Sequence, residues 1–136
     1  MFLNTTQIRI RYSETDQMGY CYYGNYAQFF EIGRVETLRA LGVSYRSLEE
    51  RGIMLPVLEL NVKYHKAAKY DDLISIQTKL LKIPSAKIEF EYQIFNEENE
   101  LLTTAYTKLV FISSKTMKPI QAPEDVIKKI KELDQD

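Results

Sequence analysis

The sequence predicts an α+β fold in which an antiparallel sheet of about five strands wraps around one long helix, with a further helix at the C-terminus. Two observations carry this prediction. Residues 26–41 place apolar side chains on more than one stripe, which is typical of a helix covered on most of its girth. From residue 58 to residue 94 apolar and polar residues alternate in segments separated by turn sequences, and a more evenly apolar segment follows at about 101–112. A helix that is apolar almost all round needs a sheet curled about it, so both patterns indicate one shared core.

The N-terminal half is expected to contain one strand and two helices. The strand alternates apolar and basic side chains, with Ile8, Ile10 and Tyr12 around Arg9 and Arg11. The long helix begins near Asn25, and Gly42 closes it, since glycine readily adopts the conformation of a helix C-terminal cap. Ser44 is a suitable N-cap for a short second helix that ends at Gly52.

The rest of the strands follow Pro56 in meander order. The first of them is predicted to have one buried face, which consists of Leu58, Leu60, Val62 and Tyr64. Turn sequences separate it from strands at 74–80, 88–94 and about 101–112, namely Tyr70-Asp71-Asp72, Pro84-Ser85 and Asn96-Glu97-Glu98-Asn99. The C-terminal helix begins at Pro123, and its apolar stripe consists of Val126, Ile127, Ile130 and Leu133.

Length and composition exclude several classes of protein. The 136 residues suit a single domain, 1–136. The net charge of −1 argues against a nucleic-acid partner, because there is no basic excess to release counterions from phosphates. Cys21 is the only cysteine, which excludes an internal disulfide and suits a reducing compartment. Neither a leader pattern nor a run of about eighteen apolar residues occurs. We therefore expect a cytoplasmic protein without membrane insertion.

The connection between the first strand and the long helix carries most of the chemical information. Residues 12–26 hold one aspartate, Asp16, among turn-forming residues and aromatics. A carboxylate just before a helix lies near unpaired backbone N–H groups and the positive end of the helix dipole. This arrangement supplies a base or nucleophile beside a site for an oxyanion.

On these residues the sequence resembles the 4-hydroxybenzoyl-CoA thioesterase family, whose members have the hotdog fold. The resemblance depends on Tyr12-x-Glu14-Thr15-Asp16-Gln17-Met18-Gly19, on Asn25-Tyr26 at the helix start and on Tyr70-Asp71-Asp72 before the next strand. The order of elements agrees from about residue 7 to residue 115. The resemblance implies an enzyme that hydrolyses the thioester of an acyl- or aroyl-CoA. Coenzyme A is then part of the substrate, and no separate cofactor is expected.

The resemblance also implies roles for individual residues. Asp16 matches the catalytic acid of the family, which attacks the thioester carbonyl or activates a water. Tyr23 falls where the family uses a backbone N–H to hold the oxyanion. Many bacterial members have histidine there, so this chain departs from that subgroup while the backbone role is retained. Substrate contacts are expected from Gly19, Gly24, Asn25 and Tyr26.

A local basic patch is expected to bind the phosphates of coenzyme A, and it consists of Lys63, His65, Lys66 and Lys69. Within this patch Lys63, His65 and Lys66 are the candidate substrate ligands. Lys82 and Lys87, which flank the Pro84-Ser85 turn, suit the same role equally well. A solvated strand face would explain either set without any ligand.

Several residues also have a plainer interpretation. Asp16 alone would be a turn former or a helix cap, and only the surrounding motifs favour catalysis. Glu14 could be a second acid or point to solvent, and Thr15 could bond Asp16 or merely shape the turn. A Cys21–His65 dyad is conceivable but has no motif support. With one cysteine and one histidine, a zinc site is not expected.

Two function classes stay open. In a thioesterase Asp16 is ionised and aimed at the thioester carbon, whereas in a non-catalytic acyl-CoA-binding hotdog protein it is only a cap. A dehydratase of the same fold is less favoured, since it would need a histidine near the helix start.

Edge strands invite pairing with another chain, so we expect a homodimer or homotetramer whose sites use residues from two chains.

Overall fold

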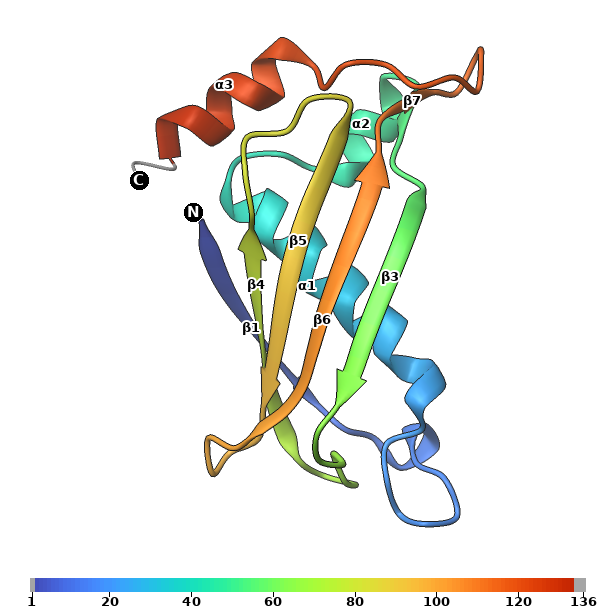
Figure 1. Ribbon diagram of the computed structural model, residues 1–136, viewed down its shortest axis with the longest axis vertical. Helices are drawn as coiled ribbons and strands as arrows, with labels where there is room; N and C mark the ends of the chain where they lie inside the picture. The colour runs from blue at the N-terminus through green and yellow to red at the C-terminus, as the bar shows by residue number, and fades with distance from the viewer. Residues whose placement is uncertain (1, 134–136) are drawn as a thin grey trace.

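The computed structural model describes residues 2–133 (Figure 1). The elements are β1 (Leu3–Arg9), α1 (Tyr26–Ala40), α2 (Tyr45–Glu50), β2 (Ile53–Met54), β3 (Val57–Tyr64), β4 (Leu73–Leu80), β5 (Lys87–Phe95), β6 (Leu101–Val110), β7 (Ile112–Ser113) and α3 (Glu124–Leu133). Two 3-10 turns, Tyr12–Glu14 and Tyr23–Asn25, lie between β1 and α1. A five-stranded antiparallel sheet has the order β1-β4-β5-β6-β3, and β2 pairs with β7. The predicted α+β class, sheet and C-terminal helix are confirmed.

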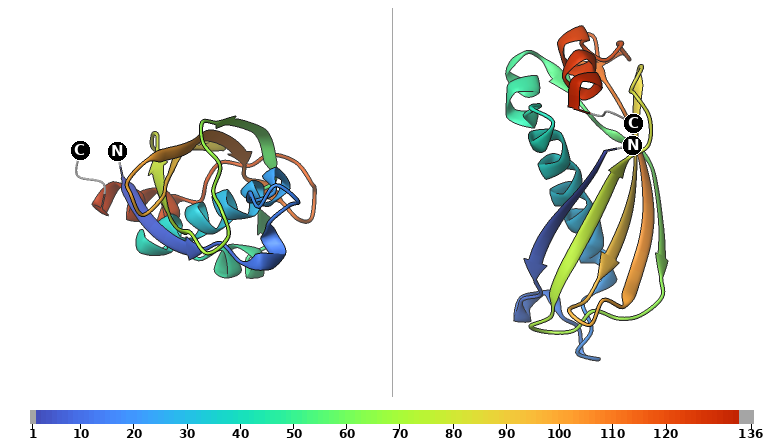
Figure 2. Two further views of the ribbon diagram at one scale, coloured as in Figure 1. Left: turned by 90° about the horizontal axis from the view of Figure 1, so that it is seen from below. Right: turned by 90° about the vertical axis from the view of Figure 1, so that its left-hand side faces the viewer.

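The sheet curves about α1, which crosses its concave side (Figure 2). The core between them includes Ile74, Ile76, Leu80, Ile88, Phe90 and Ile94, all of which are at most 1% exposed. Gly33 brings α1 close to β4, because a Cβ at this position would lie 2.4 Å from Thr78 Oγ1 and 3.1 Å from Ile76 Cγ2. The packing there leaves no room for a methyl group.

The ends of the two N-terminal helices fold as the sequence predicts. Gly42 has a φ of +84° and follows the C-cap Leu41, and its N–H donates to the carbonyl of Arg39. The N–H of Val43 donates to the carbonyl of Leu38, which completes a Schellman motif. At the start of α2, the N–H of Ser47 donates to Ser44 Oγ over 3.3 Å.

The first and last strands differ from the prediction. Tyr12 is not part of a strand but begins a 3-10 turn, with its side chain 78% exposed. The cause is local: the Glu14 carboxylate accepts the N–H of Arg11 over 2.8 Å, which folds the chain into the turn. The strand predicted for 101–112 divides at Phe111, whose N–H donates to the carbonyl of Ala86.

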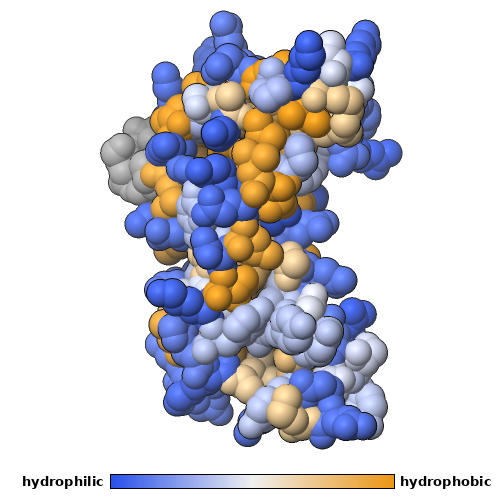
Figure 3. All heavy atoms as spheres, turned by 45° about the vertical axis from the view of Figure 1, so that its right-hand side comes forward, coloured by the Kyte–Doolittle hydropathy of each residue, from blue (hydrophilic) through white to orange (hydrophobic). Residues whose placement is uncertain are grey.

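The face of β3 that was predicted to be buried is largely exposed. Leu58, Leu60 and Tyr64 are 44–55% exposed, and only Val62 of this face packs partly against the core. Leu60 and Tyr64 pair with the buried Thr107 and Thr103 of β6, so they lie on the face of the sheet toward α1. Because β3 is an edge strand, α1 leaves this face uncovered. Figure 3 shows the resulting apolar band.

Candidate active site

The connection between β1 and α1 is held by a buried carboxylate. Glu14 is only 7% exposed, and its second oxygen accepts from Arg11 Nη2 over 3.3 Å. Burial by itself raises the pKa of Glu14, but the hydrogen bonds and charge of Arg11 outweigh it, and the pKa lies below 4.5. Glu14 therefore points inward and holds the loop. Thr15 Oγ1 donates to the carbonyl of Tyr12 over 2.7 Å, so it shapes the turn rather than bonding Asp16.

Asp16 is half-buried, and its two carboxylate oxygens differ. Oδ1 accepts the N–H of Met18 over 2.9 Å and that of Tyr20 over 3.3 Å. Gly19, with a φ of +77°, closes this tight loop by donating its N–H to the carbonyl of Asp16. Oδ2 has no hydrogen-bond partner among residues 2–133. The two interpretations of Asp16 are thus compatible, because Oδ1 forms the turn and Oδ2 is left for catalysis.

The start of α1 is tied to the same loop. Asn25 Nδ2 and the N–H of Tyr22 each donate to the carbonyl of Glu14 over 2.8 Å. The N–H groups of Tyr23 and Gly24 have no acceptor within the described part of the chain. They stand at the positive end of a 15-residue helix, which is a favourable place for a developing negative charge.

A cavity of about 260 Å³ joins these groups. Its lining consists of Asp16, Met18, Tyr20, Cys21, Tyr23, Tyr26, Tyr64, His65, Lys66 and Ala67. The cavity therefore brings together Asp16, Tyr23, Tyr26, His65 and Lys66 of the predicted site. Gly19, Gly24 and Asn25 are not among the residues that line it.

Tyrosines form the apolar wall of the cavity. Tyr64 contacts Tyr26 edge to face, with ring centroids 5.0 Å apart. Burial raises the pKa of Tyr26 to about 12, so its phenol is neutral at physiological pH. Sequence reasoning missed Tyr20 and Tyr64 as lining residues. The alternation in β3 did place Tyr64 on the helix side, but nothing in it indicated that the end of this strand meets the Asp16 loop.

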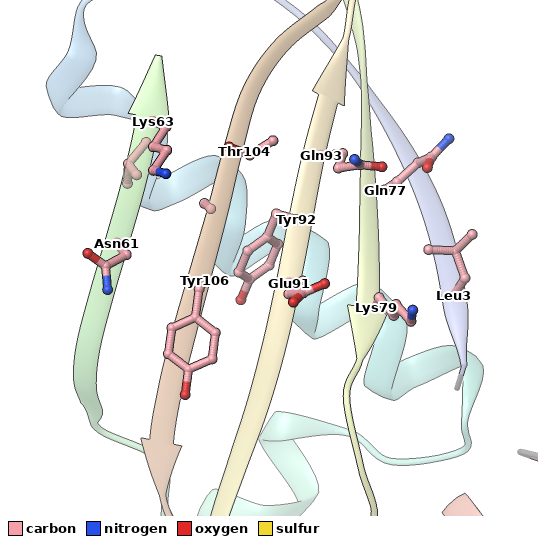
Figure 4. Close-up of a pocket in the computed structure, with 12 residues that line it drawn as sticks. Leu3, Asn61, Lys63, Gln77, Lys79, Glu91, Tyr92, Gln93, Thr104 and Tyr106 are labelled. Atoms are coloured by element: carbon pink, nitrogen blue, oxygen red, sulfur yellow. The ribbon is translucent and has the colours of Figure 1, made fainter. Parts of the chain in front are cut away.

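Of the lysines predicted to bind phosphate, Lys66 and Lys69 line one hollow, and the others lie apart from it. Lys63 is on the convex face of the sheet, in a separate hollow with Gln77, Glu91 and Tyr106 (Figure 4). Lys66 forms a hydrogen-bonded ion pair with Glu100. Lys82 pairs with Glu89 over 3.3 Å and, like Lys87, lies near the turn between β4 and β5, at the other end of the sheet from Asp16 (Figure 1).

Cys21 and His65 line the same cavity but form no dyad. Burial, aided by the charges of Glu14 and Asp16, raises the pKa of Cys21 to about 11. Cys21 Sγ lies 3.8 Å from the carbonyl of Tyr22, and His65 Nε2 lies 3.1 Å from Thr104 Oγ1. In residues 2–133 no cluster of three His, Cys, Asp or Glu side chains could hold a metal ion, and no helix is long and apolar enough to cross a membrane.

Comparison with known proteins places this geometry in a family. The chain is similar in structure to the DHNA-CoA thioesterase of Staphylococcus aureus, with a TM-score of 0.91 and 38% identity over 99% of this chain and 95% of that one. It is 33% identical to the Haemophilus influenzae acyl-CoA thioesterase YbgC over 88% of both chains. The Escherichia coli acyl-CoA thioester hydrolase YbgC is 31% identical over 96% of this chain and 100% of its own length.

The family model described as the thioesterase-like superfamily matches residues 10–130. This range contains the Asp16 loop, α1 and the whole of the sheet except β1. The predicted hotdog fold and enzyme class, a thioester hydrolase, are confirmed. The chain belongs to the thioesterase-like superfamily.

Proposed function

We propose that this protein hydrolyses the thioester of an acyl- or aroyl-CoA, with Asp16 as the catalytic acid and the N–H of Tyr23 as an oxyanion donor. One observation carries the proposal: Asp16, whose Oδ2 is unbonded, and Tyr23, whose N–H is unbonded, line one cavity. A thioesterase needs both groups near the same carbonyl, one to form the new bond and one to hold the negative charge.

Two routes use these groups. In the first, Asp16 Oδ2 attacks the thioester carbon, the C–S bond breaks, and water hydrolyses the resulting mixed anhydride to restore the carboxylate. In the second, Asp16 takes a proton from a water that attacks the same carbon, and the proton passes to the departing sulfur. Both give a carboxylic acid and free coenzyme A. In both, the N–H of Tyr23 binds the oxygen that becomes negative in the transition state.

We infer that the acyl group is aromatic. The cavity wall contains Tyr20, Tyr23, Tyr26 and Tyr64, and rings pack well on rings. The Staphylococcus aureus relative is named for DHNA-CoA, which makes this aroyl-CoA the first substrate to test.

We further propose that two copies pair through β3, at least as a homodimer. This edge exposes apolar side chains on the face toward α1, whereas β1 at the other edge exposes alternate residues only. An uncovered edge with exposed apolar side chains favours pairing with another strand. The pairing would also cover the Tyr64 wall of the cavity.

Hydrolysis of a panel of acyl- and aroyl-CoAs tests the proposal. We expect turnover of aroyl-CoA, and a loss of about 10²-fold or more in Asp16→Asn, which keeps the shape of the side chain but removes its charge. Asp71→Asn is the matched control, because Asp71 is an exposed turn residue with a φ of +68°, which asparagine tolerates. Equal activity in Asp16→Asn and the wild type would overturn the role of Asp16. Binding of acyl-CoA without turnover would favour the non-catalytic binder.

A further inference from the structure

We propose that a second copy of the chain supplies the cations that hold the phosphates of coenzyme A, from Lys115 and Lys118 in the turn after β7. The inference rests on the proposed function. It names the missing part of that site, namely a positively charged surface for the nucleotide end of the substrate.

The surroundings of Asp16 within one chain are poorly suited to phosphates. A hollow of about 480 Å³ adjoins the Asp16 cavity and shares Tyr20, Lys66 and Ala67 with it. Its charged lining residues are Lys66, Lys69, Asp72, Glu98 and Glu100. Acids outnumber lysines, and Lys66 is already bound to Glu100. A ligand with several phosphates would be repelled here unless cations come from elsewhere.

The pairing of β3 determines what lies opposite this hollow. A two-fold axis that makes β3 its own neighbour makes the two copies antiparallel, because each residue must then face its partner reciprocally. The Tyr64 end of one strand thus lies beside the Val57 end of the other. β3 has 8 residues and so spans about 26 Å, which separates its two ends clearly.

The segments next to these two ends of β3 determine which parts of the two copies meet. The Tyr64 end continues directly into His65, Lys66 and Ala67, which line the Asp16 cavity. The Val57 end follows β2, which pairs with β7, and the turn 114–119 projects from β7 at the same end of the molecule (Figure 1). In the antiparallel dimer the turn of each copy is therefore placed beside the Asp16 cavity of the other.

The turn 114–119 has the properties of a phosphate-binding segment. Lys115 and Lys118 are exposed, and neither has an ion-pair partner within the described residues. Ser113 Oγ accepts the N–H of Lys115, and the N–H of Met117 donates to the carbonyl of Ser113 over 2.7 Å. The N–H of Ser113 in turn donates to the carbonyl of Lys118 over 3.0 Å. The backbone of the turn is thereby fixed, so the binding of a phosphate there does not require the main chain to become ordered.

Steady-state kinetics with two thioesters of the same aroyl group test the proposal. One thioester is formed with coenzyme A and the other with pantetheine, which lacks the nucleotide phosphates. In the Lys115→Gln/Lys118→Gln variant we expect KM for the CoA thioester to rise about tenfold with little change in kcat. Both constants for the pantetheine thioester should stay at wild-type values. The control Lys128→Gln/Lys131→Gln changes the charge equally on α3 and should match the wild type.

A mixed dimer tests whether the lysines act across the interface. One chain carries Asp16→Asn, and the other carries Lys115→Gln/Lys118→Gln. Only the second chain has an intact Asp16, and its cavity faces the unaltered turn of the first. A wild-type KM in this dimer supports the proposal, and a KM raised as in the lysine variant shows that each chain uses its own lysines and overturns it.

Failure of the inference is distinct from failure of the proposed function. If the wild type hydrolyses the CoA thioester and the lysine variant has the same KM, the lysines do not bind the phosphates. If the wild type hydrolyses neither thioester, the proposed function fails. Calorimetric titration with free coenzyme A then decides the inference, and equal affinity of the wild type and the lysine variant overturns it.

Discussion

The two sides of α1 differ in how they are covered. Toward β4 and β5 the helix is sealed, with Gly33 against Thr78 and core side chains such as Phe90 without solvent exposure. Toward β3 the sheet extends past the helix, and Leu58 and Leu60 are 55% and 44% exposed.

The two sides of α1 are therefore expected to have different roles. The sealed side provides the packed core on which the stability of the chain depends. The open side ends at Tyr64 and the Asp16 loop, so it is the side on which the proposed ligand and second chain would bind. Changes on the sealed side should therefore alter stability, and changes on the open side should alter turnover.

The largest effect is expected where the open side meets the start of α1. Tyr23→Pro removes one N–H, and the position tolerates proline because it begins a 3-10 turn and Tyr22 before it is extended, with a ψ of 131°. We expect kcat to fall by about 10²-fold while the melting temperature changes little.

Tyr23→Ala is the control for this variant, since it keeps the N–H but, like proline, lacks the ring that lines the cavity. Tyr23→Phe removes only the hydroxyl and should retain most of the activity. Equal losses in Tyr23→Pro and Tyr23→Phe would show that the phenol takes part, equal losses in Tyr23→Pro and Tyr23→Ala would assign the effect to the ring, and full activity in Tyr23→Pro would transfer the role to the N–H of Gly24.

A charge on the open edge should disrupt the proposed dimer. Leu60→Asp places a carboxylate in the apolar band, and we expect light scattering to show monomers and activity to fall about tenfold or more. Leu3→Asp makes the same change on the other edge strand, where Leu3 is 53% exposed, and should leave both measurements unchanged. Active monomers of Leu60→Asp would contradict the shared site.

The sealed side should respond in stability alone. Gly33→Ala forces a methyl group against Thr78, and we expect the free energy of unfolding to fall by about 2 kcal/mol. Urea titration measures this loss, and kcat below the unfolding midpoint should equal that of the wild type. A Gly33→Ala variant as stable as the wild type would mean that α1 and β4 can move apart.

The smallest of these effects concerns the loop that carries Asp16. The folded-state pKa of Glu14 is lowered, so its ionised form contributes stability that is present above pH 4.5 and is lost as the pH falls through the folded pKa. Glu14→Gln should therefore lower the free energy of unfolding by about 1 kcal/mol at neutral pH. The difference should shrink in acid, and a difference independent of pH would contradict the Arg11–Glu14 interaction.

The parts of the fold that the sequence predicts are those controlled by local chemistry. Gly42 and Ser44 terminate and start helices through their own backbone and hydroxyl groups, so neighbouring residues suffice to identify them. The same holds for Asp16, whose loop is built from bonds to Met18 and Tyr20 within a few residues.

The parts that could not be predicted depend on distant neighbours. Alternation shows that one face of β3 is apolar, but it does not show whether α1 or another chain covers that face. The position of Tyr64 beside Tyr26 depends on the register of β3 against β6, which no short segment encodes. The pairing of Lys66 with Glu100, 34 residues away, changes a predicted phosphate ligand in the same way.

The high pKa of Cys21 has a consequence for the chemistry of the cavity. A thiolate beside a thioester would exchange acyl groups with it and leave the protein acylated on sulfur, in competition with hydrolysis. With a pKa of about 11 the Cys21 thiol stays protonated, so in the proposed mechanism the thiol does not divert the acyl group from hydrolysis. Mass spectrometry of the enzyme during turnover should accordingly show no adduct on Cys21, and an acylated Cys21 would mean that the thiol is less well protected than its burial indicates.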